Sequence, residues 1–159
     1  MKAFTLWQPW ASLVVEGSKP YEFRSWRAHR SVIGQRIVIH ASARKVDHRE
    51  VAQLLRLLEA GGKFAAATCL LPVEKAIEVL RTGDWPLAAG LGTAIVGEPV
   101  LGDKLAIDFG VVKANDSDRD YHSNWGWPML DIERWAEPVP MRGAQGLWTW
   151  PTAEMAGLA

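Results

Sequence analysis

Short segments typical of β-strands are spread along the whole chain of 159 residues. They are rich in β-branched and aromatic residues and are bounded by glycine, proline or polar residues. Helical segments do not alternate regularly with them, which argues against a doubly wound parallel sheet. The pattern predicts an α+β fold, in which a small β-barrel of about six strands carries two to four helices. The predicted strands are residues 2–6, 19–26, 36–41, 92–100 with an extension over 101–112, 127–132 and 147–150.

Helical periodicity is clearest between residues 47 and 60. Apolar residues recur there at the spacing of one helix face, and Asp47 suits the N-terminal cap. A shorter helix is predicted after Pro9, which fits a first helical turn, and another over residues 73–80. We therefore expect one domain over residues 1–150, with a helical insertion at about 44–90 and a C-terminal tail at 151–159.

The sequence shows neither a transmembrane segment nor a signal peptide, and this bears on where we expect the protein to be located. No apolar run is long enough for a transmembrane helix, and the first residues lack the apolar core of a signal peptide. The single Cys69 excludes an intramolecular disulfide and fits a reducing compartment. We expect a cytoplasmic protein without a membrane partner.

Charge is unevenly distributed, although the formal net charge is zero. Residues 1–63 contain 11 Lys and Arg against 5 Asp and Glu, whereas residues 64–159 contain 7 against 13. Between residues 27 and 49, Asp47 is the single acidic residue among six basic ones. This excess favours an anionic partner such as RNA, and the alternative is a solvated surface with a dipole.

Charged and aromatic side chains are closely interleaved in residues 4–26, FTLWQPWASLVVEGSKPYEFRSW. If residues 19–26 form a strand, Glu22, Arg24 and Trp26 share one face, because side chains alternate. Such a face can bind a planar polar ligand, with an indole for stacking and a guanidinium for phosphate or a base edge. Lys19 and Glu22 can also serve in proton transfer. The structural alternative is a set of ion pairs at the mouth of a barrel.

Four blocks of sequence, in this order, resemble the ASCH domain family over about residues 2–150. They are TLWQPWASLVVEGSKPYEFRSW, IVIHAS, TAIVGEPVL and, after a late tryptophan-containing strand, GAQGLW. The first block is the most specific, because it contains a G-x-K-x-x-E-x-R pattern formed by Gly17, Lys19, Glu22 and Arg24. The resemblance implies a PUA-like β-barrel whose cleft, beside the first helix, holds RNA or a modified nucleoside.

The resemblance also implies possible activities. Some members of the family are amidohydrolases of acylated cytidine that use a Lys, a Thr nucleophile and a Glu, and others are described as ribonucleases. The family pattern places Thr directly after the Lys, and this chain has Pro20 there. Proline has no hydroxyl and cannot be a nucleophile, so the amidohydrolase interpretation is weakened. Ser18 lies on the same predicted strand face as Pro20, and no spacing argument favours Ser25 or Ser42.

We therefore predict an RNA- or nucleoside-binding protein. One alternative is an enzyme in the same cleft, either a ribonuclease or a modified-nucleoside amidohydrolase, and a second is a protein-interaction domain. The candidate catalytic residues are Lys19 and Glu22. The candidate ligand-binding residues are Gln8, Trp10, Arg24, Trp26, His40, Ser42, Arg44 and Lys45.

For several of these residues a structural role is the stronger alternative. Trp10 fits core packing, and His40 fits a hydrogen-bonded position at a strand end. The acidic run Asp116, Asp118 and Asp120 lacks the glycine and the final carboxylate of a calcium loop, so we interpret it as a solvated loop. We predict neither a metal ion nor a cofactor, and the sequence does not indicate an oligomeric state.

Overall fold

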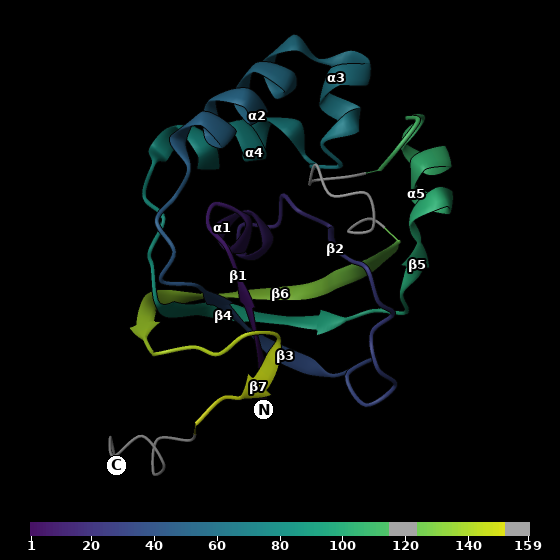
Figure 1. Ribbon diagram of the computed structural model, residues 1–159. Helices are drawn as coiled ribbons and strands as arrows, with labels where there is room; N and C mark the ends of the chain where they lie inside the picture. Colours follow the sequence, from purple (N-terminus) through teal and green to yellow (C-terminus); the bar gives the residue numbers. More distant parts are fainter. Residues whose placement is uncertain (115–123, 152–159) are drawn as a thin grey trace.

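The computed structural model describes residues 1–114 and 124–151, and this part of the chain contains seven strands and five helices. The strands curl into half a barrel, and the helices lie mainly on one side of it (Figure 1). The fold class predicted from the sequence is therefore confirmed, with more helices than expected. The strands are β1 (Lys2–Leu6), β2 (Tyr21–Arg24), β3 (Arg36–Ala41), β4 (Ala89–Val96), β5 (Val100–Leu101), β6 (Trp125–Pro140) and β7 (Leu147–Thr149).

The sheet is mostly antiparallel. Its strand order is β2-β6-β4-β3-β1-β7, and the short β5 pairs with β6. β1 and β3 form the parallel pair, in a register that places Thr5 opposite His40. β6 is much longer than predicted: its first residues pair with β2 and β5, and its later residues pair with β4 through two register shifts. This irregular strand joins the two parts of the curled sheet.

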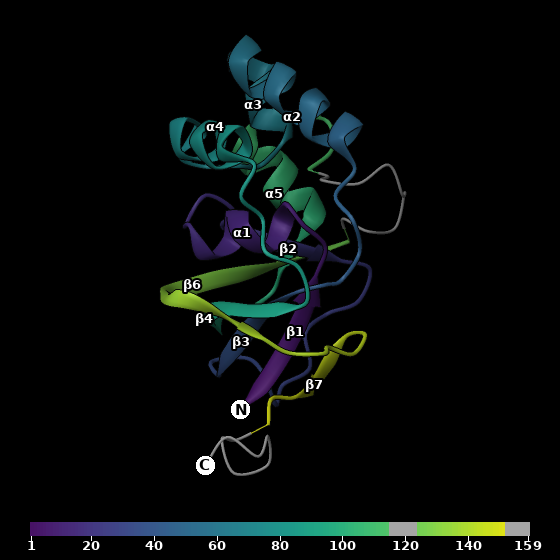
Figure 2. The same cartoon turned by 90° about the vertical axis from the view of Figure 1, so that its left-hand side faces the viewer.

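Helix α1 (Trp10–Val15) lies between the sheet and a second helical layer (Figures 1 and 2). All six of its residues are buried, because apolar cores form on both of its sides. Val14 packs with the sheet, whereas Trp10 and Leu13 pack under the helices above. Those helices are α2 (His48–Ala60), α3 (Gly62–Ala67) and α4 (Val73–Thr82), which all follow β3 and precede β4 in the sequence.

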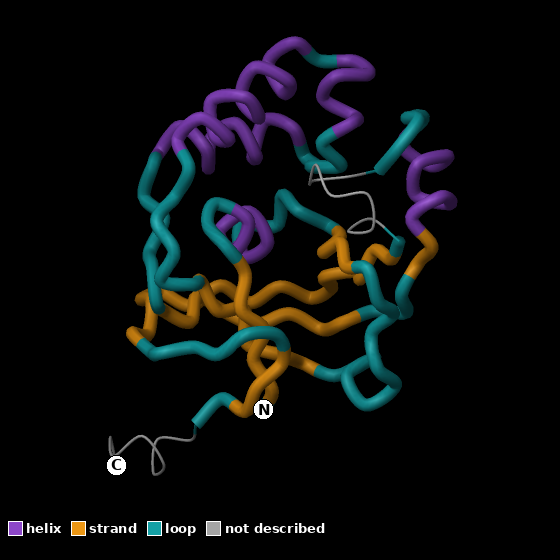
Figure 3. The backbone as a smooth tube through the Cα atoms, viewed as in Figure 1, coloured by secondary structure: helices purple, strands orange, loops and turns teal. Residues whose placement is uncertain are grey.

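The longest helix, α2, forms where periodicity predicts it. The Asp47 carboxylate accepts a hydrogen bond of 2.9 Å from the backbone N–H of Arg49, which satisfies one free donor of the first turn. Val51, Leu54 and Leu58 are the buried residues of its apolar face. The separation of this helical layer from the strands is clear in Figure 3.

The prediction that the strand continues over residues 101–112 is wrong. Apart from the last residue of β5, this segment contains helix α5 (Gly102–Phe109). Leu105 and Ala106 are buried, and Gly110 ends the helix in the left-handed conformation at φ 68°. A short apolar run fits a strand or a buried helix equally well by pattern, and packing against Phe23 selects the helix here.

The predicted solvated loop with Asp116, Asp118 and Asp120 lies outside the described residues, as does the tail from residue 152 onward. None of the helices in the described ranges is long and apolar enough to cross a membrane.

Candidate ligand-binding cleft

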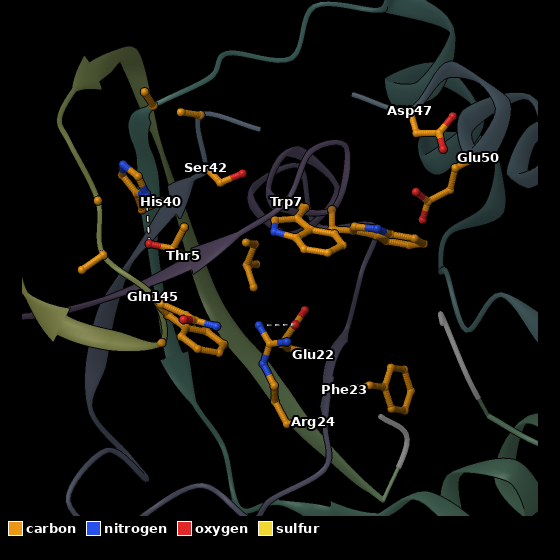
Figure 4. Close-up of a pocket in the computed structure, with 18 of the residues that line it drawn as sticks. Thr5, Trp7, Glu22, Phe23, Arg24, His40, Ser42, Asp47, Glu50 and Gln145 are labelled. Atoms are coloured by element: carbon orange, nitrogen blue, oxygen red, sulfur yellow. Dashed lines mark hydrogen bonds and ion pairs between the residues drawn. The ribbon is translucent and has the colours of Figure 1, made fainter. Parts of the chain in front are cut away.

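A large cleft of about 1780 Å³ opens between the curled sheet and the helical layer. Its walls come from β1, β2, β3, helix α2 and the segment of residues 140–146 that precedes β7. Figure 4 shows labelled residues from each of these walls around one space. Segments that are far apart in the sequence therefore face the same cleft.

The structure brings six of the predicted site residues to the cleft and leaves four outside its lining. The lining residues among them are Trp10, Glu22, Arg24, Trp26, His40 and Ser42. The predicted residues that do not line the cleft are Gln8, Lys19, Arg44 and Lys45. The cleft thus contains two separate polar groups, one around Glu22 and one around His40.

The first polar group, here called the Glu22 cluster, consists of Lys19, Glu22 and Arg24. Glu22 Oε1 lies 3.1 Å from Arg24 Nη2, and Glu22 Oε2 lies 3.5 Å from Lys19 Nζ. The side chains of Lys19 and Glu22 are 2% and 6% exposed, whereas that of Arg24 is 22% exposed. Glu22 and Arg24 therefore lie side by side on one face of the strand, as expected from the sequence.

Lys19 is held behind the cleft. Its ammonium donates a hydrogen bond of 2.7 Å to the carbonyl of Tyr21. It also lies 5.3 Å from the ring centroid of Trp10 and 5.2 Å from that of Phe23, in cation–π geometry. Lys19 therefore supports Glu22 from within the core and is not among the residues that line the cleft.

The Glu22 carboxylate has one hydrogen-bonding position that the described residues leave open. Oε2 is buried and accepts no hydrogen bond from them, although the Lys19 ammonium is near. A buried carboxylate oxygen without a hydrogen bond is unfavourable, because it has lost water without a replacement. The charge of this oxygen is balanced by the Lys19 ammonium, 3.5 Å away.

Two tryptophans present exposed rings to the cleft. The exposed fractions of Trp7 and Trp26 are 48% and 44%, unusual values for such a large apolar side chain. The Arg44 guanidinium carbon lies 3.6 Å from the ring centroid of Trp7. Trp7 was missed in the sequence, although it adjoins the candidates Gln8 and Trp10. Its exposure depends on the turn before α1.

Gln8 has a structural role at the start of α1. Its amide nitrogen donates to the carbonyl of Pro86 and to Ser12 Oγ, both at 2.8 Å, and its amide oxygen accepts from the Ser12 N–H. Ser18 is fully buried and donates to the carbonyl of Leu13. It is therefore unable to replace the hydroxyl that Pro20 lacks.

The second polar group, here called the His40 cluster, consists of Thr5, His40, Trp148 and the carbonyl of Met141. His40 Nδ1 lies 3.1 Å from Thr5 Oγ1, and His40 Nε2 lies 2.8 Å from the Met141 oxygen. The Trp148 indole N–H donates to Thr5 Oγ1 at 2.9 Å. His40 is 1% exposed, and this burial lowers its pKa, while the bond to Met141 acts in the opposite direction.

The tautomer of His40 follows from these partners. A carbonyl oxygen only accepts hydrogen bonds, so Nε2 carries the hydrogen that points to Met141. In the neutral ring Nδ1 is then the acceptor, and the Thr5 hydroxyl donates to it. Neither Thr5 nor the segment around Met141 was predicted as part of the site from the sequence. The strand alternation that placed Glu22 beside Arg24 carries no information about contacts between β1, β3 and residue 141.

The basic excess of residues 27–49 is partly neutralised in the fold. Arg27 pairs with Glu98, and Arg36 pairs with Asp131. Both carboxylates come from the acidic half of the chain, which the charge count alone could not place. Arg49 lines the cleft, and Arg44 and Lys45 are exposed. In the described ranges no group of three or more His, Cys, Asp and Glu residues could hold a metal ion.

Comparison with known families identifies the class of protein. The model of the ASCH domain matches residues 4–89, which include the end of β1 and all of α1, β2, β3 and the helical layer. The chain therefore belongs to the ASCH domain family.

Solved structures agree with this class at the level of the fold. The crystal structure of ASCH from Zymomonas mobilis is 17% identical, has a TM-score of 0.53, and the match covers 99% of this chain and 91% of that one. A mutant of the Zymomonas mobilis protein gives a TM-score of 0.52 at the same identity, over 98% of this chain and 91% of that chain. No curated protein matches this chain.

Proposed function

We propose that the cleft binds RNA or a nucleoside. The observation that carries this proposal is the buried carboxylate of Glu22, a residue that lines the cleft and whose Oε2 accepts no hydrogen bond from the described residues. Nucleobases carry amino and ring N–H groups that can donate to such an oxygen. Arg24, fixed on the other carboxylate oxygen, adds a partly exposed guanidinium for a phosphate or a base edge.

The exposed indoles of Trp7 and Trp26 support the same ligand class. A flat ring in a cleft offers a stacking surface for a base, whatever the base. The size of the cleft favours more than one nucleotide, because pockets for small molecules generally measure about 300–1,000 Å³ and this one is larger. A short single-stranded RNA segment therefore fits the proposal best.

Catalysis by Lys19 and Glu22 has less support. Lys19 is not among the lining residues, and its ammonium already bonds the carbonyl of Tyr21. Pro20 supplies no nucleophile, and Ser18 is buried. Binding is therefore the proposed function, and cleavage of RNA is an outcome that the experiment below also tests.

The experiment titrates the protein with short single-stranded RNA and with the four nucleosides, and follows tryptophan fluorescence and calorimetric heat. Trp26→Ala and Trp7→Ala should each weaken RNA binding by about 1–3 kcal/mol, roughly 5- to 150-fold in Kd, because each removes a stacking surface. The matched control is Phe64→Ala, since Phe64 is 62% exposed on α3 and does not line the cleft.

Equal affinities for the wild type and all three variants would exclude this cleft as the binding site. The same samples are analysed for RNA fragments after incubation. If RNA fragments form with the wild type and do not form with Glu22→Gln, the ribonuclease alternative is favoured over binding alone.

A further inference from the structure

The cleft contains four hydroxyl groups in the described part of the chain, those of Thr5, Ser25, Ser42 and Thr68. Ser42 Oγ accepts from the backbone N–H of Arg44, and the Thr68 hydroxyl donates to the carbonyl of Ala65. Thr5 differs, because its oxygen lies within hydrogen-bonding distance of the imidazole of His40. In Figure 4 this pair lies to the upper left of Glu22 and Arg24.

The Thr5–His40 pair has the parts of an activated nucleophile. Activation of a hydroxyl requires an adjacent base, and that base must be oriented by a third group. His40 Nδ1 is the adjacent base, and the Met141 carbonyl, 2.8 Å from Nε2, is the orienting group. Burial lowers the pKa of His40, which favours the neutral ring, and in the tautomer set by Met141 its Nδ1 is the nitrogen that accepts a hydrogen bond.

The Thr5 oxygen retains a position for attack. A hydroxyl oxygen has two lone pairs, and the Trp148 N–H occupies one of them. The other remains for an electrophile that enters the cleft, which Thr5 itself lines. As Thr5 loses its proton, the Trp148 N–H stabilises the negative charge that develops on the oxygen.

The orientation of His40 is enforced by close packing. A Cβ atom at Gly143 would lie 2.3 Å from Cε1 and 2.6 Å from Nδ1 of His40. The backbone of residue 143 therefore rests against the ring, and Met141 and Gly143 together hold it from one segment. Preorganised geometry of this kind lowers the entropic cost of a reaction.

We propose that Thr5 and His40 form a catalytic pair that hydrolyses a carboxylic ester carried by a ligand in the cleft. This proposal goes beyond ligand binding. It requires that an ester enters the cleft, but it does not depend on the contacts assigned to Glu22. An ester suits this pair because its alkoxide departs with less protonation than the nitrogen of an amide.

The reaction proceeds in two balanced steps. The Thr5 oxygen forms a bond to the acyl carbon while its proton passes to His40 Nδ1, and the departing alkoxide takes that proton when the ester C–O bond breaks. Water then attacks the acyl-threonine and gives a proton to His40. The bond from Thr5 to the acyl carbon breaks, the Thr5 oxygen regains this proton, and the carboxylic acid is released.

The test uses p-nitrophenyl acetate with the full-length protein. We expect a burst of nitrophenol and a stable or transient gain of one acetyl group, which peptide mass mapping assigns to Thr5. Thr5→Ser should retain the burst, and Thr5→Val, of nearly the same shape, should lose it. His40→Gln should slow acylation by about 10²- to 10⁴-fold, the usual contribution of a general base.

Three results would overturn the proposal: no acetylation of the wild type, acetylation of a different residue, or an unchanged burst in Thr5→Val. The mapped acetyl-Thr5 in the wild type keeps the test valid if a variant does not fold. RNA titration of Thr5→Val separates the two proposals. If RNA binding fails in the wild type while Thr5 is acetylated, the proposed function is wrong and the catalytic pair stands.

Discussion

The Glu22 cluster and the His40 cluster lie in one cleft but satisfy their polar atoms differently. In the Glu22 cluster, two cations share one buried carboxylate, and Oε2 accepts no hydrogen bond from the described residues. In the His40 cluster, the Thr5 oxygen and both ring nitrogens of His40 have partners in the chain itself. The first cluster is charged and incomplete, and the second is neutral and complete.

This difference indicates a division of roles. An incomplete charged group gains a hydrogen bond when a ligand arrives, so the Glu22 cluster suits recognition. A complete neutral chain of hydrogen bonds holds each group in one orientation without a ligand, so the His40 cluster suits chemistry that needs fixed geometry. Residues of both clusters line the same cleft, among them Glu22 and Arg24 of the first and Thr5 and His40 of the second, and a ligand of its size can contact them together.

The largest expected effect concerns the stability of the Glu22 cluster. Glu22→Gln removes the carboxylate charge that faces the buried Lys19 ammonium and the Arg24 guanidinium. Breaking a buried ion pair by removing one member costs about 3–5 kcal/mol, so we expect a loss of unfolding free energy of that order. Urea unfolding, followed by tryptophan fluorescence, measures it.

Glu98→Gln is the matched control for this variant, because Glu98 pairs with Arg27 at an exposed position. Exposed pairs contribute about 0–1 kcal/mol, and the control should lie in that range. Similar losses for the two variants would show that burial does not distinguish the Glu22 cluster from a surface pair.

A smaller effect is expected when the packing of the His40 cluster is disturbed. Gly143→Ala places a methyl group against the His40 ring, and the ring or the segment must move. Overpacking of this kind costs about 1–3 kcal/mol. The same variant should lose the burst with p-nitrophenyl acetate.

Ala144→Ser is the control for Gly143→Ala, since Ala144 is exposed in the same segment. It should change stability by no more than about 0.5 kcal/mol. A wild-type burst in Gly143→Ala would contradict the claim that this segment orients His40.

The smallest effect is a dependence of stability on pH. Burial lowers the pKa of His40 in the folded protein below its ordinary value of 6.5, which the unfolded chain retains. As the pH falls below that value, the unfolded state takes up the proton first, so stability is lost as the pH falls through the folded pKa. Urea midpoints at about pH 7.5 and pH 5.5 measure this loss.

His40→Gln should reduce the difference between the two midpoints, and His48→Gln, at an exposed position on α2, should keep it. If His40→Gln shows the full wild-type difference, protonation of His40 is not its cause. The His40 cluster would then accommodate a positive charge on the buried ring, as the Glu22 cluster accommodates its buried charges.

Much of the fold could be predicted because its signals are local. The β3 sequence RIVIHA predicts a strand from its β-branched residues, and the α2 sequence predicts a helix from its periodicity. The segment 101–112 could not be predicted in this way, since an apolar run of that length fits either element until Leu105 and Phe23 pack together. β6 was underestimated because pairing with several strands, and not its own composition, extends it over residues 125–140.

The sequence by itself determined the resemblance to the ASCH family and the contact of Glu22 with Arg24. Side chains two residues apart on a strand lie on the same face of the sheet. Only the tertiary structure decided that Lys19 lies inside the core, where packing against Trp10 and Phe23 takes it out of the cleft. Only the tertiary structure formed the His40 cluster, whose members are separated by 35, 101 and 143 positions. Hydrogen bonds between such distant residues depend on strand order and register, which no local pattern contains.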